Sequence, residues 1–322
     1  MQDILAVTVP FFALVLCGYL AARQHILPEA AIPGLNAFVL YFALPCLLFR
    51  FGMNTPWFDL LNPAVLTVYV GCALLIVFFT IALTLGPALK LKDAAFGALV
   101  AAFPNTGFMG VPLLVALFGD AAAGPVISTV LADLFITSSL CIALAQSQDA
   151  SGQGPRAALG KALRGALSNP LPWAIAAGAV FSVLGWKLAG PPDVIVKMLA
   201  DAASPVALFT IGAVLWRAGS HLNRKTPLAQ TLPVVVIKLV IHPLLVFAVG
   251  LAARSLGAPL SVFQLTVLTL AAALPSASNV SLLAERYGAD NGRSARIILW
   301  STALALVSFS LLAWLFGAQP QG

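Results

Sequence analysis

Two proline-containing stretches, each in the middle of an apolar segment, hold the residue types best suited to bind a ligand. The first, 101–112, reads Ala-Ala-Phe-Pro-Asn-Thr-Gly-Phe-Met-Gly-Val-Pro, and the second, 272–281, reads Ala-Ala-Leu-Pro-Ser-Ala-Ser-Asn-Val-Ser. Proline removes a backbone donor and clashes with the preceding turn, so we expect helix breaks at Pro104 and Pro275. Amide groups freed at such a break carry partial positive charge, which stabilises an anion. The predicted chemistry is therefore noncovalent anion binding.

Small polar side chains beside both breaks add neutral donors and acceptors at the same depth. The candidate substrate ligands are Asn105, Thr106, Ser276, Ser278 and Asn279. A single helix of this kind is more simply explained as a proline kink in which Ser and Thr replace the lost hydrogen bonds. Two interruptions at corresponding positions of the two halves of a chain are instead typical of a transporter binding site.

Two charged residues lie within apolar segments. Lys238 stands in Val-Val-Val-Ile-Lys-Leu-Val-Ile, and Asp133 stands in Val-Leu-Ala-Asp-Leu-Phe. A charge at mid-membrane costs about 2.5–3.5 kcal/mol on insertion scales, so such residues are usually functional or paired. Two functional hypotheses follow: the two side chains form a buried pair, or Lys238 faces a substrate carboxylate directly. The structural alternative is a lysine whose ammonium reaches the membrane interface. For His242, one turn after Lys238, we predict a packing role.

The sequence carries no motif for covalent or nucleotide-driven chemistry. It contains no H-E-x-x-H, G-x-S-x-G or P-loop sequence. The three histidines are scattered, and the four cysteines show no metal-ligand spacing. We therefore predict a protein that is not an enzyme and that has no cofactor and no metal site. An intramembrane enzyme acting on lipid is the alternative, but we find no nucleophile with a base in reach.

The composition excludes an ordinary soluble domain. Of the 322 residues, 61% are hydrophobic and only 9% are charged, whereas soluble domains carry about 25% charged residues. The net charge of +6 comes from basic residues in short segments between apolar runs. This distribution favours membrane orientation over phosphate binding, so the predicted partner is the lipid bilayer and no nucleic acid is expected.

Apolar segments long enough to span a membrane recur along the whole chain. A spanning helix needs about 20 apolar residues. Ten segments meet this requirement, and they predict an all-α polytopic membrane protein: Ile4–Ala22, Ile32–Phe51, Val65–Leu85, Ala94–Phe118, Gly124–Ala145, Pro170–Leu188, Leu199–Trp216, Leu232–Ala253, Val262–Leu283 and Ile297–Phe316.

The basic residues predict how these helices are oriented. Twelve of the 17 Lys and Arg residues lie in the connections that follow the first, third, fifth, seventh and ninth segments, and four lie on the opposite side. Cytoplasmic connections carry the excess of Lys and Arg. We therefore expect a multi-pass protein of the cell (inner) membrane with both termini outside the cytoplasm.

Pro and Gly residues repeat along the chain at a constant offset. A shift of 160 residues aligns Pro10 with Pro170 and Gly18 with Gly178, and it aligns the two P-x-x-L-F-x-x-G sequences that begin at Pro45 and Pro205. Towards the second half of each repeat the offset drifts to 171, which aligns the prolines of the two predicted breaks. Since five helices is an odd number, the second repeat must enter the membrane inverted, which is typical of secondary transporters.

The two break sequences resemble those of the auxin efflux carrier family. The resemblance rests on Phe-Pro-Asn-Thr-Gly-Phe-Met-Gly-Val-Pro-Leu from Phe103, and on Leu-Pro-Ser-Ala-Ser-Asn-Val from Leu274 with the following Leu-Ala-Glu-Arg-Tyr-Gly. It extends over essentially the whole chain, including Lys238 to Pro243. The bacterial members are described as permeases for malate, malonate or other dicarboxylates. The long hydrophilic loop of the plant members is absent here.

The resemblance implies a fold similar to that of bile-acid sodium symporters. Broken helices 4 and 9 would cross, and Asn105 would match the substrate-contacting asparagine beside the crossing proline. Helices 1, 2, 6 and 7 would form a scaffold that also makes a homodimer, and the others would form a moving core. The expected parts are scaffold 1–53, core 54–146, cytoplasmic loop 147–169, scaffold 170–226 and core 227–322.

Together these features predict a carrier of a small organic anion, an auxin-like carboxylate or a dicarboxylate, that works by elevator-type alternating access. The charges of Lys238 and Asp133 would serve the site or its coupling. The alternative within the same class is a sodium- or proton-coupled symporter of a larger amphipathic anion. A sodium-dependent uptake assay separates the two.

Overall fold

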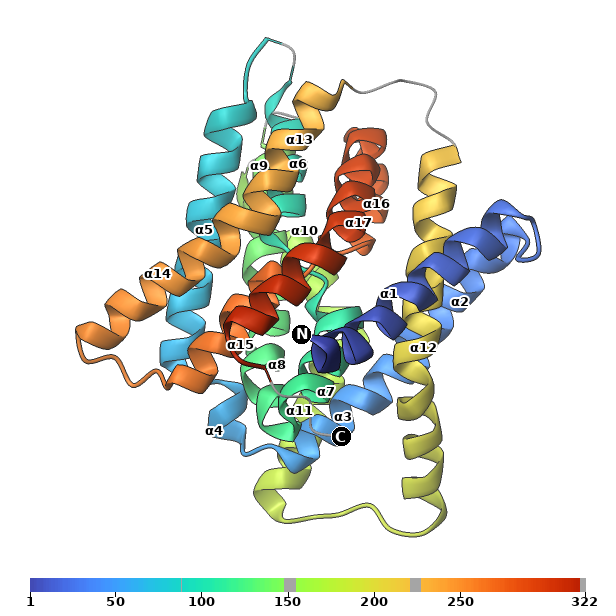
Figure 1. Cartoon of the computed structure of the whole chain (residues 1–322), viewed down its shortest axis with the longest axis vertical. Coiled ribbons are helices and arrows are strands. Elements are labelled where there is room, and N and C mark those ends of the chain that lie inside the picture. Colours follow the sequence, from blue (N-terminus) through green and yellow to red (C-terminus); the bar gives the residue numbers. More distant parts are fainter. Residues whose placement is uncertain (88, 148–154, 221–226, 319–322) are drawn as a thin grey trace.

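The structure is a computed structural model that describes the chain except for residues 88, 148–154, 221–226 and 319–322 (Figure 1). The described residues form helices and no β-strand, as the sequence predicts. Large apolar side chains cover the outside of the molecule. On α5 (Pro63–Thr84), for example, Leu75, Phe78 and Leu83 are each more than half exposed. Apolar surface of this extent is suited to lipid rather than water.

Seven helical segments in the described part of the chain are long and apolar enough to cross a membrane. Three of them contain short 3-10 or π-helical turns, labelled η: η1 and η4 are 3-10 turns at the start of a segment, and η2, η5 and η6 are π-helical turns between α-helical parts. The seven are α1 (Gln2–Arg23), η1–α3 (Glu29–Asn54), α4–α5 (Trp57–Thr84), η4–α9 (Asp120–Gln146), α12 (Pro191–Ser220), α13–α14 (Leu228–Ser255) and α17 (Asn291–Leu315).

The remaining three predicted spans are not long continuous helices. The segment predicted as Ala94–Phe118 divides into α6 (Leu91–Ala102), η3 (Thr106–Gly110) and α7 (Val111–Phe118). The segment predicted as Val262–Leu283 divides into α15 (Val262–Ala273) and α16 (Asn279–Arg286). Both interruptions contain the proline that the sequence indicated. Proline interrupts the helix because it has no N–H to donate to the preceding turn.

The third, predicted as Pro170–Leu188, is the 15-residue helix α11 (Pro170–Leu184). It stops at Gly185, whose φ of 66° is the left-handed conformation that ends many helices. A bend of 54° joins α11 to the last part of α10 (Pro155–Leu167). The helix α10 thus occupies most of the stretch 147–169, for which the sequence predicted a loop. Residues 148–154 of that stretch lie outside the described residues.

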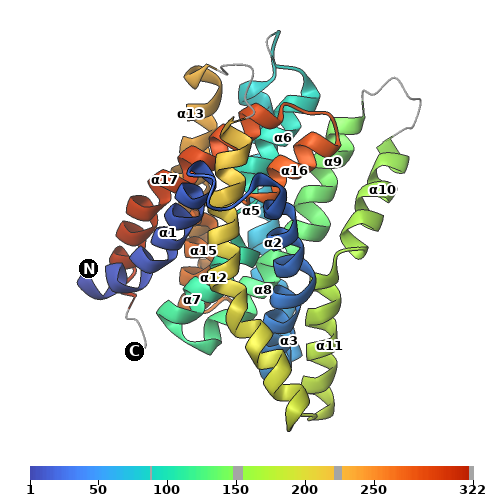
Figure 2. The same ribbon diagram turned by 90° about the vertical axis from the view of Figure 1, so that its right-hand side faces the viewer.

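Two pairs of helices cross at unusually close range: α1 with α12, and α3 (Leu44–Asn54) with α11 (Figure 2). A Cβ atom at Gly18 would overlap the carbonyl of Phe209, and one at Gly212 would overlap that of Val15. In the other pair, a Cβ at Gly178 would overlap the carbonyl of Phe49. Glycine at these positions therefore lets the helix backbones touch, as small residues do in membrane proteins.

The helices that precede the basic connections all end on one side of the molecule. These are α1, α5, α9 (Ser138–Gln146), α12 and α16, which end towards the top in Figures 1 and 2, whereas α3 and α11 end towards the bottom. The helix ends that lead into the predicted Lys- and Arg-rich connections are therefore collected at one end of the molecule.

One of these basic residues is not a loop charge. Arg293, in the first turn of α17, is only 2% exposed. Its Nη1 donates to the carbonyl of Asp93 at 2.9 Å, and its Nε donates to that of Gln230 at 3.1 Å. The guanidinium thus joins α6, α13 (Leu228–Val236) and α17 into one packed group.

Candidate functional site

The two helix breaks lie against each other in the interior of the protein. The backbone N–H of Asn105 donates to the carbonyl of Pro275 at 2.8 Å, and that of Ala277 donates to the carbonyl of Phe103 at 3.0 Å. Pro104 and Ser276 form an isolated antiparallel bridge. Unwound backbone inside a membrane must have its polar groups satisfied within the protein. Here each break supplies part of the other's hydrogen bonding, and we call this paired region the crossing.

Four of the predicted ligands have a buried polar atom at the crossing that makes no hydrogen bond to any residue the structure describes. These atoms are Asn105 Oδ1, Thr106 Oγ1, Ser276 Oγ and Asn279 Oδ1. The side chains of Asn105, Thr106 and Ser276 are at most 2% exposed. Buried polar groups nearly always have a partner, so a cluster without one requires an explanation. A bound ligand with several oxygen atoms would supply the partners, since hydroxyl and amide groups both donate and accept.

Ser278 is also at the crossing, directly before α16. It is 7% exposed, and its side chain makes no capping hydrogen bond to the helix. Its carbonyl accepts from Ser281 Oγ at 2.9 Å. The hydroxyl of Ser278 is therefore not used by the helix that follows it.

Four helix ends meet at the crossing. The segments η3–α7 and α16 begin there, and α6 and α15 end there. Helix beginnings carry unpaired N–H groups and partial positive charge, whereas helix ends carry unpaired carbonyls and partial negative charge. The crossing thus offers positive ends to an anion and negative ends to a cation.

Lys238 reaches this region from η6 (Ile237–Ile241) and is fully buried. Its Nζ donates to the carbonyl of Ala272 in the last turn of α15 at 2.7 Å, and lies 3.4 Å from His242 Nδ1. Within the described part of the chain, the ion pairs do not include one between Lys238 and Asp133. The two charges interact at longer range.

Asp133, at the start of η5 (Asp133–Thr137), is fully buried and held by two hydroxyl groups. Tyr69 donates to its Oδ2 at 2.8 Å, and Thr137 donates to its Oδ1 at 3.1 Å. The ring of Tyr69 lies 6.2 Å from that of His242, which links the two sides of this polar cluster. A buried carboxylate requires such donors to remain stable.

Sequence reasoning missed two residues of this region. Tyr69 and Ser301 lie in apolar helices, and a single hydroxyl residue there gives no pattern that distinguishes it from packing residues. Ser301 Oγ accepts the backbone N–H of Ser276 at 3.2 Å. His242, for which the sequence predicts a packing role, is fully buried, and its Nδ1 lies 3.4 Å from Lys238 Nζ.

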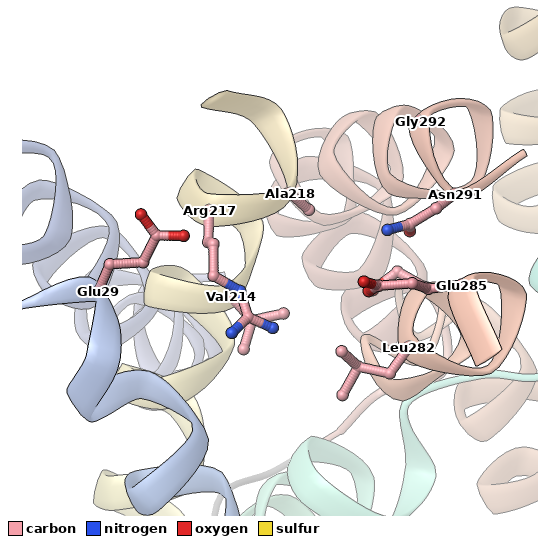
Figure 3. A pocket seen from close by; sticks show the side chains of 9 residues that line it. Glu29, Val214, Arg217, Ala218, Leu282, Glu285, Asn291 and Gly292 are labelled. Atoms are coloured by element: carbon pink, nitrogen blue, oxygen red, sulfur yellow. The ribbon is translucent and has the colours of Figure 1, made fainter. Parts of the chain in front are cut away.

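A cavity of about 440 Å³ separates α12 from α16 and α17 (Figure 3). Arg217 of α12 and Glu285 and Asn291 of the other side face it, together with Glu29. Ser281 and Leu282 also line it, only one turn beyond Ser278. The cavity therefore carries charged and polar groups, lies about one turn along α16 from Ser278, and is at the end of the molecule where α12 and α16 finish. The described residues hold no group of three or more His, Cys, Asp or Glu side chains that could bind a metal.

A family model described as "Membrane transport protein" matches residues 3–313. The chain belongs to this family, that of the auxin efflux carriers. Among its relatives is a "Putative malonate transporter" of Rhizobium meliloti, 30% identical over 99% of this chain and 98% of the other. The uncharacterized transporter YfdV of Escherichia coli is 27% identical over 86% of each chain. Auxin efflux carrier component 8 of Arabidopsis thaliana is 24% identical over 88% and 89%.

Membership of this transporter family agrees with the helical, lipid-suited architecture: the protein is a polytopic membrane transporter. It also agrees with the absence of a catalytic motif from the sequence, since the family members named here are transporters. The unpartnered polar atoms at the crossing are accordingly candidates for solute binding rather than for covalent chemistry.

Proposed function

We propose that the protein is a secondary transporter that moves a small organic anion across the membrane by alternating access. The observation that carries this proposal is the cluster of four unpartnered, buried polar atoms where two interrupted helices begin. Paired interruptions near the membrane centre, with helix beginnings directed at an anionic group, are the usual site design of such transporters.

In this proposal Pro104 and Pro275 open the helices, and five side chains bind the substrate. These are Asn105, Thr106, Ser276, Ser278 and Asn279. Their neutral donors and the two helix beginnings suit a carboxylate, and the presence of such groups on both breaks suits a compact substrate with two carboxylates. Malonate, which the name of the Rhizobium relative carries, is the first substrate to test.

We further infer two inverted five-helix repeats. The close helix crossings support this arrangement. The offset of 160 that relates Gly18 to Gly178 also relates Gly52 to Gly212, and these four glycines make the two crossings α1–α12 and α3–α11. If the two halves are repeats related by this offset, the α1–α12 contact and the α3–α11 contact are equivalent. The seven long segments, the two interrupted ones and α11 then provide the ten helices.

The proposed division into scaffold and core follows the cavity. Residues 1–53 and 170–226 would form the scaffold, residues 54–146 and 227–322 the moving core, and 147–169 the cytoplasmic connection. The cavity lies between α12 on the scaffold side and α16–α17 on the core side. An opening between two such bodies is what elevator-type or rocking movement requires.

The proposed location is the cell (inner) membrane, with both termini outside the cytoplasm. Support comes from the ends of α1, α5, α9, α12 and α16, which gather the basic connections on one side. The cavity would then open to the cytoplasm. A homodimer through the scaffold is supported by α1 and η1–α3, whose apolar windows have the smallest buried share among the seven spans.

Uptake of labelled malonate into proteoliposomes tests the function. The wild-type protein is expected to take up malonate and to be inhibited by unlabelled malonate. Asn105→Ala is expected to weaken binding about tenfold, which corresponds to about 1.4 kcal/mol. Asn36→Ala, in the half-buried part of α2 (Ile32–Phe38), is the matched control and should transport normally. Equal uptake by Asn105→Ala and wild type would refute the binding site.

A competition series then defines the substrate class. Malonate, malate, acetate and indole-3-acetate are each added in excess to the wild-type assay. Inhibition by dicarboxylates alone supports the compact site, and inhibition by the aromatic acid alone points to an auxin-like substrate. Absence of any carboxylate flux in correctly folded protein would contradict the proposed function.

A further inference from the structure

The ammonium of Lys238 occupies an unusual position, because it is bound to the end of a broken helix. Nζ donates to the carbonyl of Ala272 at 2.7 Å, in a side chain that has no exposed surface. In a continuous helix this carbonyl would accept the backbone N–H of Ser276, four residues later. Here the N–H of Ser276 donates to Ser301 Oγ instead. The break therefore frees the carbonyl, and Lys238 takes it.

The neighbouring carbonyls show the same effect of the break. Pro275 has no N–H to give to Ala271, which accepts from Leu274 at 3.3 Å. The N–H of Ala277, which would serve Ala273, donates across the crossing to Phe103. The last turn of α15 thus ends in carbonyl oxygens without their helical donors, and this end carries the negative charge of the helix dipole.

A second basic side chain stands at the equivalent end of the other broken helix. His242 follows Lys238 by one turn and lies beside the backbone of Ala101 in α6. Ala101 and Ala272 each precede the break proline by three residues. The segment η6–α14 (His242–Ser255) therefore brings one basic residue to each of the two equivalent helix ends. His242 Nε2 makes no hydrogen bond among the described residues.

Helix ends of this kind are the places where transporters with interrupted helices bind a coupling cation such as sodium. A bound sodium ion needs several oxygen ligands at one point. At the end of α15 that point is filled by an ammonium, a compact charge with three donors. Asp133 has a buried carboxylate whose charge interacts with that of Lys238. This carboxylate accepts hydrogen bonds from Tyr69 and Thr137 and is therefore not open to an ion.

We propose that Lys238 is a tethered cation that takes the place of a coupling metal ion at the end of α15. The site therefore keeps its positive charge without sodium, and Lys238 is a positioning residue that holds the broken helix rather than a substrate ligand. The consequence for transport, sodium-independent uptake, rests on the proposed function. The binding of a cation at this helix end does not, so it is tested separately.

Thermal unfolding of the purified protein gives that separate test. Wild type is expected to have the same Tm in sodium chloride and in choline chloride of equal ionic strength. Lys238→Ala should lower the Tm by about 5 °C, which is the order expected for one buried interaction. Ethylammonium, which fits the vacated space, should restore at least half of the loss, whereas choline is too large to do so. Lys197→Ala is the control, because Lys197 is an exposed lysine paired with Asp201 on α12. The Tm of this variant should change with neither ethylammonium nor choline.

Two further variants keep the test decisive if Lys238→Ala does not fold. Lys238→Gln retains an N–H donor without the charge, and Lys238→Arg retains the charge. The proposal requires a lower Tm for Lys238→Gln and near wild-type behaviour for Lys238→Arg. A wild-type protein stabilised specifically by sodium, or a Lys238→Gln variant as stable as wild type, overturns it. Failure of malonate uptake alone would contradict the proposed function and leave this result standing.

Discussion

At the scale of single residues, the polar groups inside this protein fall into two kinds. The charged groups of Asp133 and Lys238 make hydrogen bonds within the protein. Asp133 accepts from Tyr69 and Thr137, and Lys238 donates to the carbonyl of Ala272. Asn105, Thr106, Ser276 and Asn279 instead retain free atoms. The first kind stabilises the fold around the crossing, and the second kind is available to a ligand. Substitutions should therefore separate stability from binding.

Ser276→Ala should weaken malonate binding without reducing stability. Its Oγ has no partner in the structure, so removal leaves no buried group newly unsatisfied. The lost contact to the substrate is expected to weaken binding by about 1 kcal/mol, or roughly fivefold. Isothermal calorimetry measures the affinity and thermal unfolding the stability. Ser255→Ala, exposed at the end of α14, is the control, and equal affinity in the two variants would exclude Ser276 as a ligand.

Tyr69→Phe should have the opposite profile. Removing the hydroxyl takes away a donor to the buried carboxylate of Asp133, and such a loss costs about 1–3 kcal/mol of folding free energy. Tyr41→Phe provides a matched control, because Tyr41 is 58% exposed on the apolar surface. Denaturation followed by intrinsic fluorescence compares the two. Identical stabilities would mean that the Tyr69 hydroxyl does not stabilise Asp133.

At the scale of elements, glycine sets how closely the scaffold helices approach. α1 meets α12 at Gly18 and Gly212, and α3 meets α11 at Gly52 and Gly178. Without a hydrophobic driving force between helices in lipid, such close backbone contact is a principal source of helix association. The two pairs thus fix the body against which the rest of the protein would move.

Gly212→Ala should destabilise the protein by about 1–3 kcal/mol, because the new Cβ would overlap the carbonyl of Val15 and force the helices apart. Gly219→Ala on the same helix meets nothing within 4 Å and should be neutral or slightly stabilising. The difference in Tm between these two alanine variants measures the effect. A Tm for Gly212→Ala equal to that of Gly219→Ala would show that α1 and α12 can move apart without loss of stability.

At the scale of the whole molecule, the cavity between α12 and α16–α17 marks where two bodies would separate and approach. It carries Arg217 on one side and Glu285 on the other, so its closure brings opposite charges together. Ser281 and Leu282 in its lining follow Ser278 of the crossing by about one turn of α16. Movement of the core past the scaffold is thus the step on which transport would depend.

Cross-linking across the cavity should stop uptake. The variant combines Ala218→Cys on α12 with Leu282→Cys on α16, in a background without the native cysteines, and is treated with bismaleimides. We expect malonate uptake to fall by at least tenfold after linkage, while unlinked protein transports normally. The control pair, Leu282→Cys with Gly292→Cys, lies within the core alone. Loss of uptake in the control pair as well would argue against relative movement of the two bodies.

The sequence by itself determined the class of protein and the places where two of its apolar segments are interrupted. Apolar segments too long and too numerous for a soluble core required a membrane, and the two prolines required interruptions, since both effects act locally on the chain. The predicted ligands at 105–106 and 276–279 do lie at those interruptions. Two of the ten predicted segments are interrupted at these prolines, as expected, and Gly185 ends α11 at Leu184 rather than at the predicted Leu188.

Only the tertiary structure decided which groups are partners. Whether Lys238 meets Asp133, a substrate or a helix end depends on how η6 packs against α15, and the break frees the carbonyl of Ala272 for it. Tyr69 and Ser301 acquire their roles in the same way, from helices remote in sequence. A hydrogen bond requires its donor and acceptor atoms to lie within about 3 Å of each other. The periodicity of a sequence does not give the distances between atoms on different helices.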